Sequence, residues 1–476
     1  EVALLASVTS SARAPDPLDA ETKPLVRAAL DSPSRASERS WQAVARGTGD
    51  RPNVIVITLE SVAISRLGYM DDTGRLGDRR ASPNLDRIAQ KSLRMRHAYT
   101  TATHSNYAQM AVISSLFPRR GSVLDMYQRL DYPRVLLHDF GAVLGLRTAT
   151  VSSQDETWQG MKRFQETDTP THFRHAPDHV GEHLDLVTED VSPDEATVDH
   201  AIGWIMNAKS EPFSLYLNLQ STHFPYPIPA AAPHPFEPYE PKGTFNYVRW
   251  DEADRQVILN RYDNALAYVD QQIGRLYDAL AHAGMLDSTI LVITSDHGEL
   301  FFEHELVTHG RTLFEGESRV PLLVHYPAAL DPGDDFTPVS SLDVLPTVVD
   351  LMGLPPHPAF QGESFAHFRE DGPASKESAV YLNIQGWKHY EGIVCRPYKL
   401  AYDPDNGVSE LYDVIADPNE TIDLAPSKPA VVAALRSTLR AQMDAQELYH
   451  ANSGTGKRLR AERFAPRLLP CPLLPR

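Results

Sequence analysis

The stretch that decides the fold is residues 53–59, NVIVITL, an apolar run with the length of one strand. Such a run is typical of a strand whose two faces are both covered by helices in a parallel sheet. Helical stretches at residues 84–91 and 251–283 alternate with similar runs, which are RTATVSS (147–153), FSLYLNL (213–219) and TILVITS (289–295). We therefore predict an α/β fold with a doubly wound, mostly parallel sheet flanked by helices.

A second unit begins near residue 373, where the alternation of strands and helices changes. Short strands are predicted at 380–385, 391–395 and 398–404, and a helix at 428–447. This pattern indicates a small C-terminal antiparallel sheet with a closing helix. The predicted units are an N-terminal linker or arm (1–50), the main α/β domain (51–372), a C-terminal α+β subdomain (373–450) and a poorly ordered tail (451–476).

The composition is that of a globular protein. Hydrophobic residues make up 42% of the 476 and charged residues 23%, which allows a sizeable core. Asp and Glu number 63 against 45 Lys and Arg, a formal charge of −18. This balance argues against nucleic acid or an anionic membrane as a partner, and an anionic substrate would need a local metal or basic pocket.

The two cysteines, Cys395 and Cys471, lie outside any CxxC or zinc pattern, so the sequence excludes a disulfide framework. No run of about 18 apolar residues is present that would span a membrane. The chain starts at Glu1 without an initiator methionine. We interpret it as trimmed, so that a signal peptide or membrane tether could have been removed upstream.

Polar side chains follow three of the four apolar runs. Glu60 comes after the first run, residues 220–223 (QSTH) after the third, and Asp296 and His297 after the fourth. A single such residue is more often a helix cap or a solvated loop residue. Because ligands bind outside the carboxyl ends of strands in open α/β sheets, the three together predict a site at one sheet edge.

Glu60, Asp296 and His297 form a mixed carboxylate and imidazole set. This set suits one Zn²⁺ or Mn²⁺ ion better than Ca²⁺ or Mg²⁺. It leaves coordination positions for a nucleophile and a substrate oxygen.

The segment 100–118, TTATHSNYAQMAVISSLFP, offers Thr103 and Ser105 as nucleophiles ahead of a helical run. A hydroxyl at such a position is commonly an N-cap. The same position would set an attacked anion against the helix N-terminus. We interpret the neighbouring His104 as pointing elsewhere.

From about residue 52 to 424 the chain resembles the alkaline phosphatase and sulfatase superfamily. The motifs that carry the likeness, in order, are PNVIVITLES, SPNLDRIA, SNYAQMAVISSLFP, RYDNALAYVDQQIGRL, ILVITSDHGE, HGRTLFEGESRVPLLVHYP, SLDVLPTVVDLMGL and ELYDVIADPNETIDLA. The last of these resembles the small C-terminal subdomain of sulfatases.

Two departures from sulfatases narrow the resemblance. Counting back from Pro118 puts Ser105 where sulfatases make formylglycine, but NYAQ follows instead of a sequence with Pro and Arg, which argues against that modification. Glu60 and Ser61 replace two consecutive aspartates, which argues against a calcium site. Both features resemble lipoteichoic acid synthases, phosphoglycerol transferases and phosphoethanolamine transferases. This resemblance implies an extracytoplasmic location, periplasmic or as a membrane-anchored ectodomain, and the start of the chain at Glu1 supports it.

That branch implies the role of each site residue. Glu60, Ser105, Asp296 and His297 would hold one Mn²⁺ or Zn²⁺, with Ser105 as nucleophile. Residues on the substrate side would be His223 in STHFPY and His309 in THGRT as catalytic groups, with Trp158 and Arg311 as tentative substrate contacts. We interpret the aromatic and Pro-rich segment 224–243 as packing rather than a glycan platform.

The resulting hypothesis is a metal-dependent hydrolase or phosphotransferase that acts on a phosphodiester headgroup through a covalent Ser105 intermediate, resolved by water or an acceptor alcohol. The alternative enzyme is a sulfuric ester or phosphate monoester hydrolase. The alternative of another class is a catalytically silent module that binds a headgroup. Substrates would be small-molecule, lipid-headgroup or glycan esters, and the residues do not choose among them.

Overall fold

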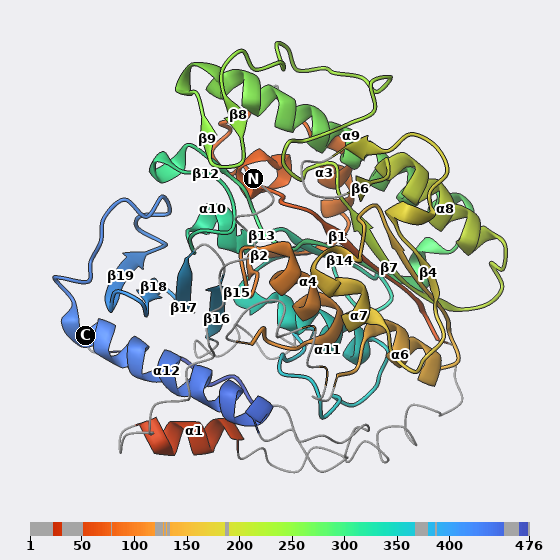
Figure 1. The fold of residues 1–476 in the computed structure, drawn as a ribbon. Helices are drawn as coiled ribbons and strands as arrows, with labels where there is room; N and C mark the ends of the chain where they lie inside the picture. The colour runs from red at the N-terminus through yellow and green to blue at the C-terminus, as the bar shows by residue number, and fades with distance from the viewer. Residues whose placement is uncertain are drawn as a thin grey trace.

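The computed structural model describes residues 22–30, 51–77, 79–119, 127, 130, 134–185, 190–366, 379–385, 388–451 and 466–474. A mixed central sheet is sandwiched between two layers of helices, and a smaller sheet lies beside it (Figure 1). In the described part of the chain, no helix is both long and apolar enough to cross a membrane.

The central sheet has the strand order β13-β2-β14-β10-β1-β7-β3-β4, with β15 also paired to β2. Strands β10, β1, β7, β3 and β4 are mutually parallel, as predicted for this half of the sheet. The strands are β1 (Asn53–Leu59), β2 (Leu93–Tyr99), β3 (Arg147–Ser152), β4 (His172–Arg174), β7 (Phe213–Leu219), β10 (Thr289–Ser295), β13 (Arg319–Val320), β14 (Leu322–His325) and β15 (Gly333–Ser340).

Strand β1 is buried along its whole length because its side chains alternate between two hydrophobic cores. Val54 and Val56 pack in the core on one face, and Ile55 and Ile57 in the core on the other. The first face is covered by α4 (Ser105–Ser114), α6 (Leu137–Val143), α7 (Met161–Gln165) and α11 (Val344–Leu351). The second is covered by α3 (Pro83–Ala89), α8 (Asp194–Met206) and α9 (Arg255–His282).

The smaller sheet is antiparallel, as predicted. Its strands are β16 (Val380–Gln385), β17 (His389–Cys395), β18 (Tyr398–Asp403) and β19 (Val408–Asp413), and α12 (Pro429–Ala451) packs on it. Helix α1 (Thr22–Leu30) lies alongside α12 (Figure 1) and shares its core through Val26 and Ala29. The N-terminal segment therefore includes a helix docked on the C-terminal subdomain.

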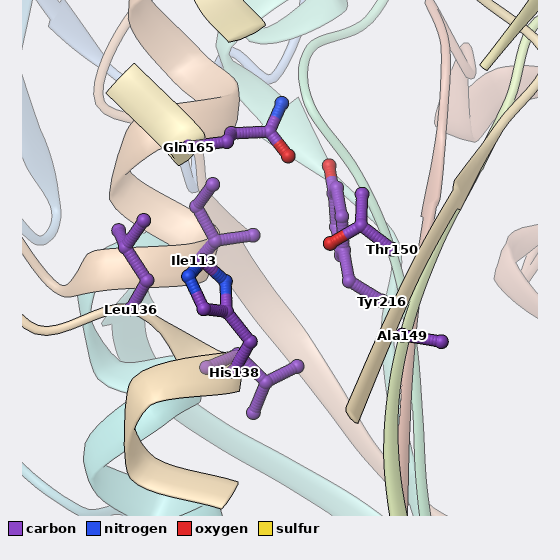
Figure 2. Close-up of a pocket in the computed structure, with 8 residues that line it drawn as sticks. Ile113, Leu136, His138, Ala149, Thr150, Gln165 and Tyr216 are labelled. Carbon is purple, nitrogen blue, oxygen red and sulfur yellow. The ribbon is translucent and has the colours of Figure 1, made fainter. Parts of the chain in front are cut away.

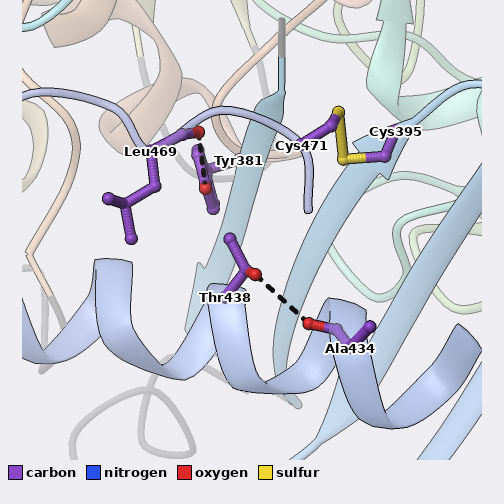
Figure 3. Close-up of a disulfide and its surroundings, with 6 residues drawn as sticks. All are labelled: Tyr381, Cys395, Ala434, Thr438, Leu469 and Cys471. Carbon is purple, nitrogen blue, oxygen red and sulfur yellow. Dashed lines mark hydrogen bonds between the residues drawn. A yellow bond between two sulfur atoms is a disulfide. The ribbon is translucent and has the colours of Figure 1, made fainter. Parts of the chain in front are cut away.

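A disulfide between Cys395 and Cys471 joins the end of β17 to the C-terminal segment, across 76 residues of chain (Figure 3). In the same segment the carbonyl of Leu469, a buried residue, accepts a hydrogen bond from the Tyr381 hydroxyl at 2.8 Å. The prediction of a poorly ordered tail is thus wrong for residues 466–474, because the disulfide and this apolar packing fix them. The two cysteines form one disulfide. The sequence excludes a framework of several disulfides and does not predict this single bond.

Candidate active site

The three strand ends predicted to form the site are neighbours in the sheet. β1 lies between β7 and β10, parallel to both. The pairing continues one residue beyond the strands, because the Glu60 N–H donates to the Leu219 carbonyl at 3.0 Å and the Asp296 N–H to the Leu59 carbonyl at 3.2 Å. The backbones that carry Glu60 and Asp296 are therefore fixed by the sheet itself.

Four predicted residues, Glu60, Ser105, Asp296 and His297, meet at this edge; we call them the site cluster. Ser105 Oγ donates to Glu60 Oε1 at 2.7 Å and lies 3.2 Å from His297 Nε2. His297 Nε2 in turn lies 3.2 Å from Glu60 Oε1 and 3.7 Å from Asp296 Oδ2. All four side chains are at least 98% buried, so water competes little with these contacts.

Ser105 is the first residue of α4, a helix whose residues are all buried. The preceding residue, His104, is extended, and its carbonyl accepts the N–H groups of Tyr107 and Ala108 at 3.0 and 3.1 Å. No side chain caps this N-terminus. The Ser105 hydroxyl is bound to Glu60 instead of capping its helix, and the positive end of the helix dipole is left for a bound anion.

The pKa shifts within the site cluster favour a positive charge at this position. Burial raises the pKa of Glu60, but the hydrogen bond and charge of His297 outweigh this and hold it well below its usual range. Burial and the nearby Glu60 carboxylate raise the pKa of Asp296 well above its usual range. Burial lowers the pKa of His297, yet Asp296 and Glu60 together raise it to about 10. The enclosed pair thus disfavours a second negative charge, on Asp296, and favours a positive charge on His297.

The donors of this cluster fit a divalent cation. Oδ2 of Asp296 is buried and has no hydrogen-bond partner within the described residues, which is costly for a carboxylate oxygen unless a cation binds it. Donor atoms of Glu60, His297 and His309 also lie within 4.8 Å of one another. Nδ1 of His297 is 2.9 Å from the Gly298 carbonyl, so Nε2 is the nitrogen left to bind a metal.

The backbone is strained on both sides of the site. Ser61 adopts φ 51° and Thr308 φ 62°, in the left-handed region that disfavours non-glycine residues and β-branched ones most. At Ser61 this turn brings the N–H to Asp296 Oδ1 at 3.1 Å and the hydroxyl to Glu60 Oε1 at 3.1 Å. At Thr308 it precedes His309.

The predicted substrate-side residues His223, His309 and Trp158 lie near the cluster. The His309 ring centroid is 4.1 Å from that of His297 and 6.0 Å from that of His223. The Trp158 ring is stacked on His104, with ring centroids 5.7 Å apart and planes 5° from parallel. His104 also meets His309 edge-on at 6.0 Å, so it points into the site, contrary to our interpretation of it.

Arg311 contacts its own loop. Its guanidinium donates to the Val307 carbonyl and to Thr308 Oγ1, the latter at 3.0 Å. A role in binding substrate therefore stays a prediction for this residue.

Three residues of the site escaped the sequence-based assignment of roles. Gln220 donates to Glu60 Oε2 at 3.2 Å, Ser61 binds Glu60 and Asp296, and Glu299 lies 3.1 Å from His309 Nδ1. Gln220 and Ser61 follow apolar strands directly, so the same strand-end signal applies to them. Glu299 has only its place after Asp296 and His297 as a signal.

A separate cavity of about 10 Å³ lies between α4, α6 and α7 and the strands β3 and β7. Figure 2 shows Tyr216 and Thr150 of the strands facing Gln165, Ile113 and His138 of the helices. This volume admits about one water molecule, which is too little for any ester substrate. The cavity is a packing defect behind the site.

Comparison with known proteins identifies the family. A family model described as Sulfatase matches residues 52–354, and one described as N-sulphoglucosamine sulphohydrolase, C-terminal, matches residues 303–447. The first covers more than half of the chain, and the second includes most of the C-terminal subdomain.

Curated sulfatases are among the relatives of this chain. Arylsulfatase K of Danio rerio is 28% identical over 306 residues, which cover 53% of this chain and 56% of the relative. Choline-sulfatase of Rhizobium meliloti (strain 1021) is 25% identical over 466 residues, 83% of this chain and 88% of the relative. The chain thus spans little more than half the length of the first relative.

Solved structures share the fold. A protein in the alkaline phosphatase superfamily from Vibrio parahaemolyticus has a TM-score of 0.65 at 18% identity, over 92% of this chain and 97% of its own. The phosphonate monoester hydrolase of Agrobacterium radiobacter has a TM-score of 0.62 at 17% identity, over 84% and 96%. The closer resemblance to lipoteichoic acid synthases and phosphoethanolamine transferases stays a prediction. The chain belongs to the sulfatase family.

Proposed function

We propose that this enzyme cleaves a phosphoester of the diester headgroup type through a covalent intermediate on Ser105. The observation that carries the proposal is the position of Ser105 Oγ, 2.7 Å from Glu60 Oε1 and 3.2 Å from His297 Nε2 at the start of a buried helix. The contacts of Ser105 with two candidate metal ligands, and the absence of a capping role for its hydroxyl, support a role as nucleophile.

We propose that Glu60, Asp296 and His297, together with Ser105, hold one divalent ion. A mixed set of carboxylates and imidazole favours Zn²⁺ or Mn²⁺ over Ca²⁺ or Mg²⁺. Such an ion would lower the pKa of the serine hydroxyl and offset the charge that builds on the reacting ester.

The reaction would proceed by two displacements at phosphorus. Ser105 Oγ gives its proton to Glu60 Oε1, to which it donates a hydrogen bond at 2.7 Å, and bonds to phosphorus while the bond from phosphorus to the ester oxygen breaks. The departing alcohol takes a proton, for which His309 and His223 are the candidate donors. Water then attacks the same phosphorus and gives a proton to that histidine, while the serine oxygen leaves and takes back its proton from Glu60. An alcohol in place of water would give group transfer.

Cleavage of a sulfate ester is the second candidate function. It is supported by relatives such as arylsulfatase K and choline-sulfatase. The residues NYAQ after Ser105 weigh against it, because they lack the Pro and Arg that accompany formylglycine in sulfatases. Without formylglycine, a serine that accepted sulfate would need direct attack by water at sulfur.

We propose that the organic part of the substrate lies against Trp158 and His104. These parallel rings form a flat, half-buried wall beside His309. A sugar ring or an uncharged headgroup would pack on such a wall. The N-acetylglucosamine-6-O-sulfatase of Bacteroides thetaiotaomicron, 32% identical over 176 residues, supports a glycan.

We also propose an extracytoplasmic location. The Cys395–Cys471 disulfide supports it, since such bonds persist in oxidising compartments and are rare in the cytosol. Fractionation of cells that produce the full-length protein tests this: recovery in the cytosolic fraction with both thiols free would overturn it.

Metal analysis with a rate comparison tests the function. Wild-type protein is assayed on p-nitrophenyl sulfate, p-nitrophenyl phosphate and bis-p-nitrophenyl phosphate beside Ser105→Ala. We expect one Zn or Mn per chain, preference for the diester, and a loss of about 10⁴-fold or more in kcat on substitution, with metal retained. Preference for the sulfate would support the second candidate, and metal-free, inert protein would support a binding module.

A further inference from the structure

His309 is held by a buried carboxylate that the reaction proposed above does not use. Glu299 Oε1 lies 3.1 Å from His309 Nδ1, and both side chains are 98% buried. The other carboxylate oxygen, Oε2, accepts the hydroxyl of Tyr226 at 3.1 Å. Tyr226, Glu299 and His309 thus form a continuous hydrogen-bonded chain that ends in the site.

The anchor of this chain comes from the aromatic and Pro-rich segment. Tyr226 lies three residues beyond His223 and adopts φ 63°, an unfavourable conformation for an aromatic residue. Edge-on contacts with Tyr262 at 5.1 Å and Phe224 at 5.9 Å enclose its ring. The packing of the segment therefore fixes one hydroxyl, and that hydroxyl fixes the Glu299 carboxylate.

The hydrogen bond to Nδ1 determines which nitrogen of His309 faces the substrate. Ser61 Oγ also lies 3.3 Å from Nδ1, but it donates its hydrogen to Glu60 Oε1 at 3.1 Å. With Nδ1 engaged by Glu299 and Ser61, the ring cannot turn without breaking these contacts, and Nε2 is left available. His297 follows the same rule, with Nδ1 held by the Gly298 carbonyl and Nε2 facing Ser105.

The backbone of His309 is held as firmly as its ring. Tyr247 donates its hydroxyl to the His309 carbonyl at 3.0 Å. Glu317 accepts the next two N–H groups, from Gly310 at 2.8 Å and Arg311 at 3.3 Å. Because main chain and Nδ1 are both fixed, the position of Nε2 follows from Glu299.

We propose that Glu299, anchored by Tyr226, is a positioning residue that orients His309 so that Nε2 meets the leaving-group oxygen of the ester. This role rests on the proposed function, in which His309 is a candidate proton donor to the departing alcohol. It assigns a purpose to the start of segment 224–243, whose aromatic residues otherwise serve as packing.

A double-mutant cycle tests the proposal. We expect Glu299→Ala to lower kcat by about 10–100-fold with KM and metal content unchanged. Tyr226→Phe should lower kcat in the same direction but less. In a His309→Ala background, Glu299→Ala should cost nothing further, because it acts through that ring. Asp270→Asn, a buried carboxylate on α9 that binds the N–H of Leu85, serves as the control with unchanged kcat.

An equal loss with and without His309 would overturn the proposal, as would wild-type kcat for Glu299→Ala. If the alanine variant fails to fold, Glu299→Gln, of the same shape, takes its place in the cycle. A crystal structure of the variant gives a readout independent of activity: we expect a rotated His309 ring, and an unchanged ring would contradict us. Should wild type cleave none of the three esters, the proposed function fails while this structural test still stands.

Discussion

Two buried groups of charged residues in this molecule are built differently. The site cluster holds two carboxylates and an imidazole. Asp296 Oδ2 has no hydrogen-bond partner within the described residues and lies 3.7 Å from His297 Nε2. The second group, which we call the Lys399 cluster, joins the main domain to the C-terminal subdomain. There Lys399 Nζ lies 3.1 Å from Glu315, 2.5 Å from Glu420 and 2.7 Å from the Leu313 carbonyl.

The difference lies in where the compensating positive charge comes from. Lys399 Nζ donates to the Leu313 carbonyl and to Glu315 and forms an ion pair with Glu420, whose other carboxylate oxygen accepts the Glu315 N–H at 2.6 Å. The Lys399 cluster therefore contains its own permanent cation. In the site cluster the positive charge depends on the protonation of His297, an imidazole. The two groups thus differ in whether their positive charge is permanent or comes from a group that also offers a metal-binding nitrogen.

We expect the largest effect from a substitution in the site cluster, on metal binding and on activity. Asp296→Asn removes the carboxylate whose oxygen is unpartnered, so we expect metal affinity to fall by on the order of 10²-fold or more and kcat/KM by about 10³-fold or more. Stability without metal should change little, since a neutral amide is cheaper to bury. Metal analysis, steady-state rates and urea unfolding measure these quantities. Full metal content in the variant would remove Asp296 from the ligand set.

For the Lys399 cluster we expect the opposite result, a large effect on stability and none on activity. Lys399→Met leaves Glu315 and Glu420 buried without their cation, so we expect a loss of about 3–5 kcal/mol in the free energy of unfolding. The kcat of the folded fraction should stay at the wild-type value. Adding Glu315→Gln and Glu420→Gln should restore most of the stability. A loss below about 1 kcal/mol would show that this cluster is not what joins the subdomains.

A smaller effect is expected in the pH dependence of the Lys399 cluster. Burial raises the pKa of Glu420 to about 7 although Lys399 opposes the shift. Because this pKa lies above the unfolded value near 4.3, its contribution to stability is fully present below that value and is lost as pH rises through about 7. Relative to Glu420→Gln, wild type should lose about 1–3 kcal/mol between pH 5 and pH 8. Urea unfolding at both pH values measures this, and a constant difference would contradict it.

The comparison also separates what the sequence could predict from what it could not. Glu60, Asp296 and His297 were found because each follows a buried apolar strand, and the parallel order brings strand ends together. Nothing local marks Lys399, whose partners lie 84 residues earlier and 21 residues later. The Cys395–Cys471 pair is likewise distant in the chain, with a sequence separation of 76 residues.

Half of the central sheet was missed for a related reason. β2, LRMRHAY, carries polar residues that hide its strand pattern. In the structure Arg94 pairs with Asp334 of β15 at 2.6 Å, and Arg96 pairs with Asp72. The charges of these side chains are paired by residues distant in the chain. The periodicity of the segment alone therefore does not predict a buried strand. The antiparallel strand β14 is four residues long, too short for a distinct pattern.

The strained backbone at Ser61 and Thr308 has a consequence for anyone who wishes to evolve this enzyme toward heat resistance. Glycine or asparagine at either position would relieve the left-handed strain, so a screen for thermostable variants should recover them. The same substitutions would remove the Ser61 hydroxyl, which donates to Glu60 Oε1, and the Thr308 hydroxyl, which donates to the Tyr247 carbonyl. The most thermostable variants from such a screen would have a low kcat. A mutant library for this purpose should therefore keep Ser61 and Thr308 unchanged.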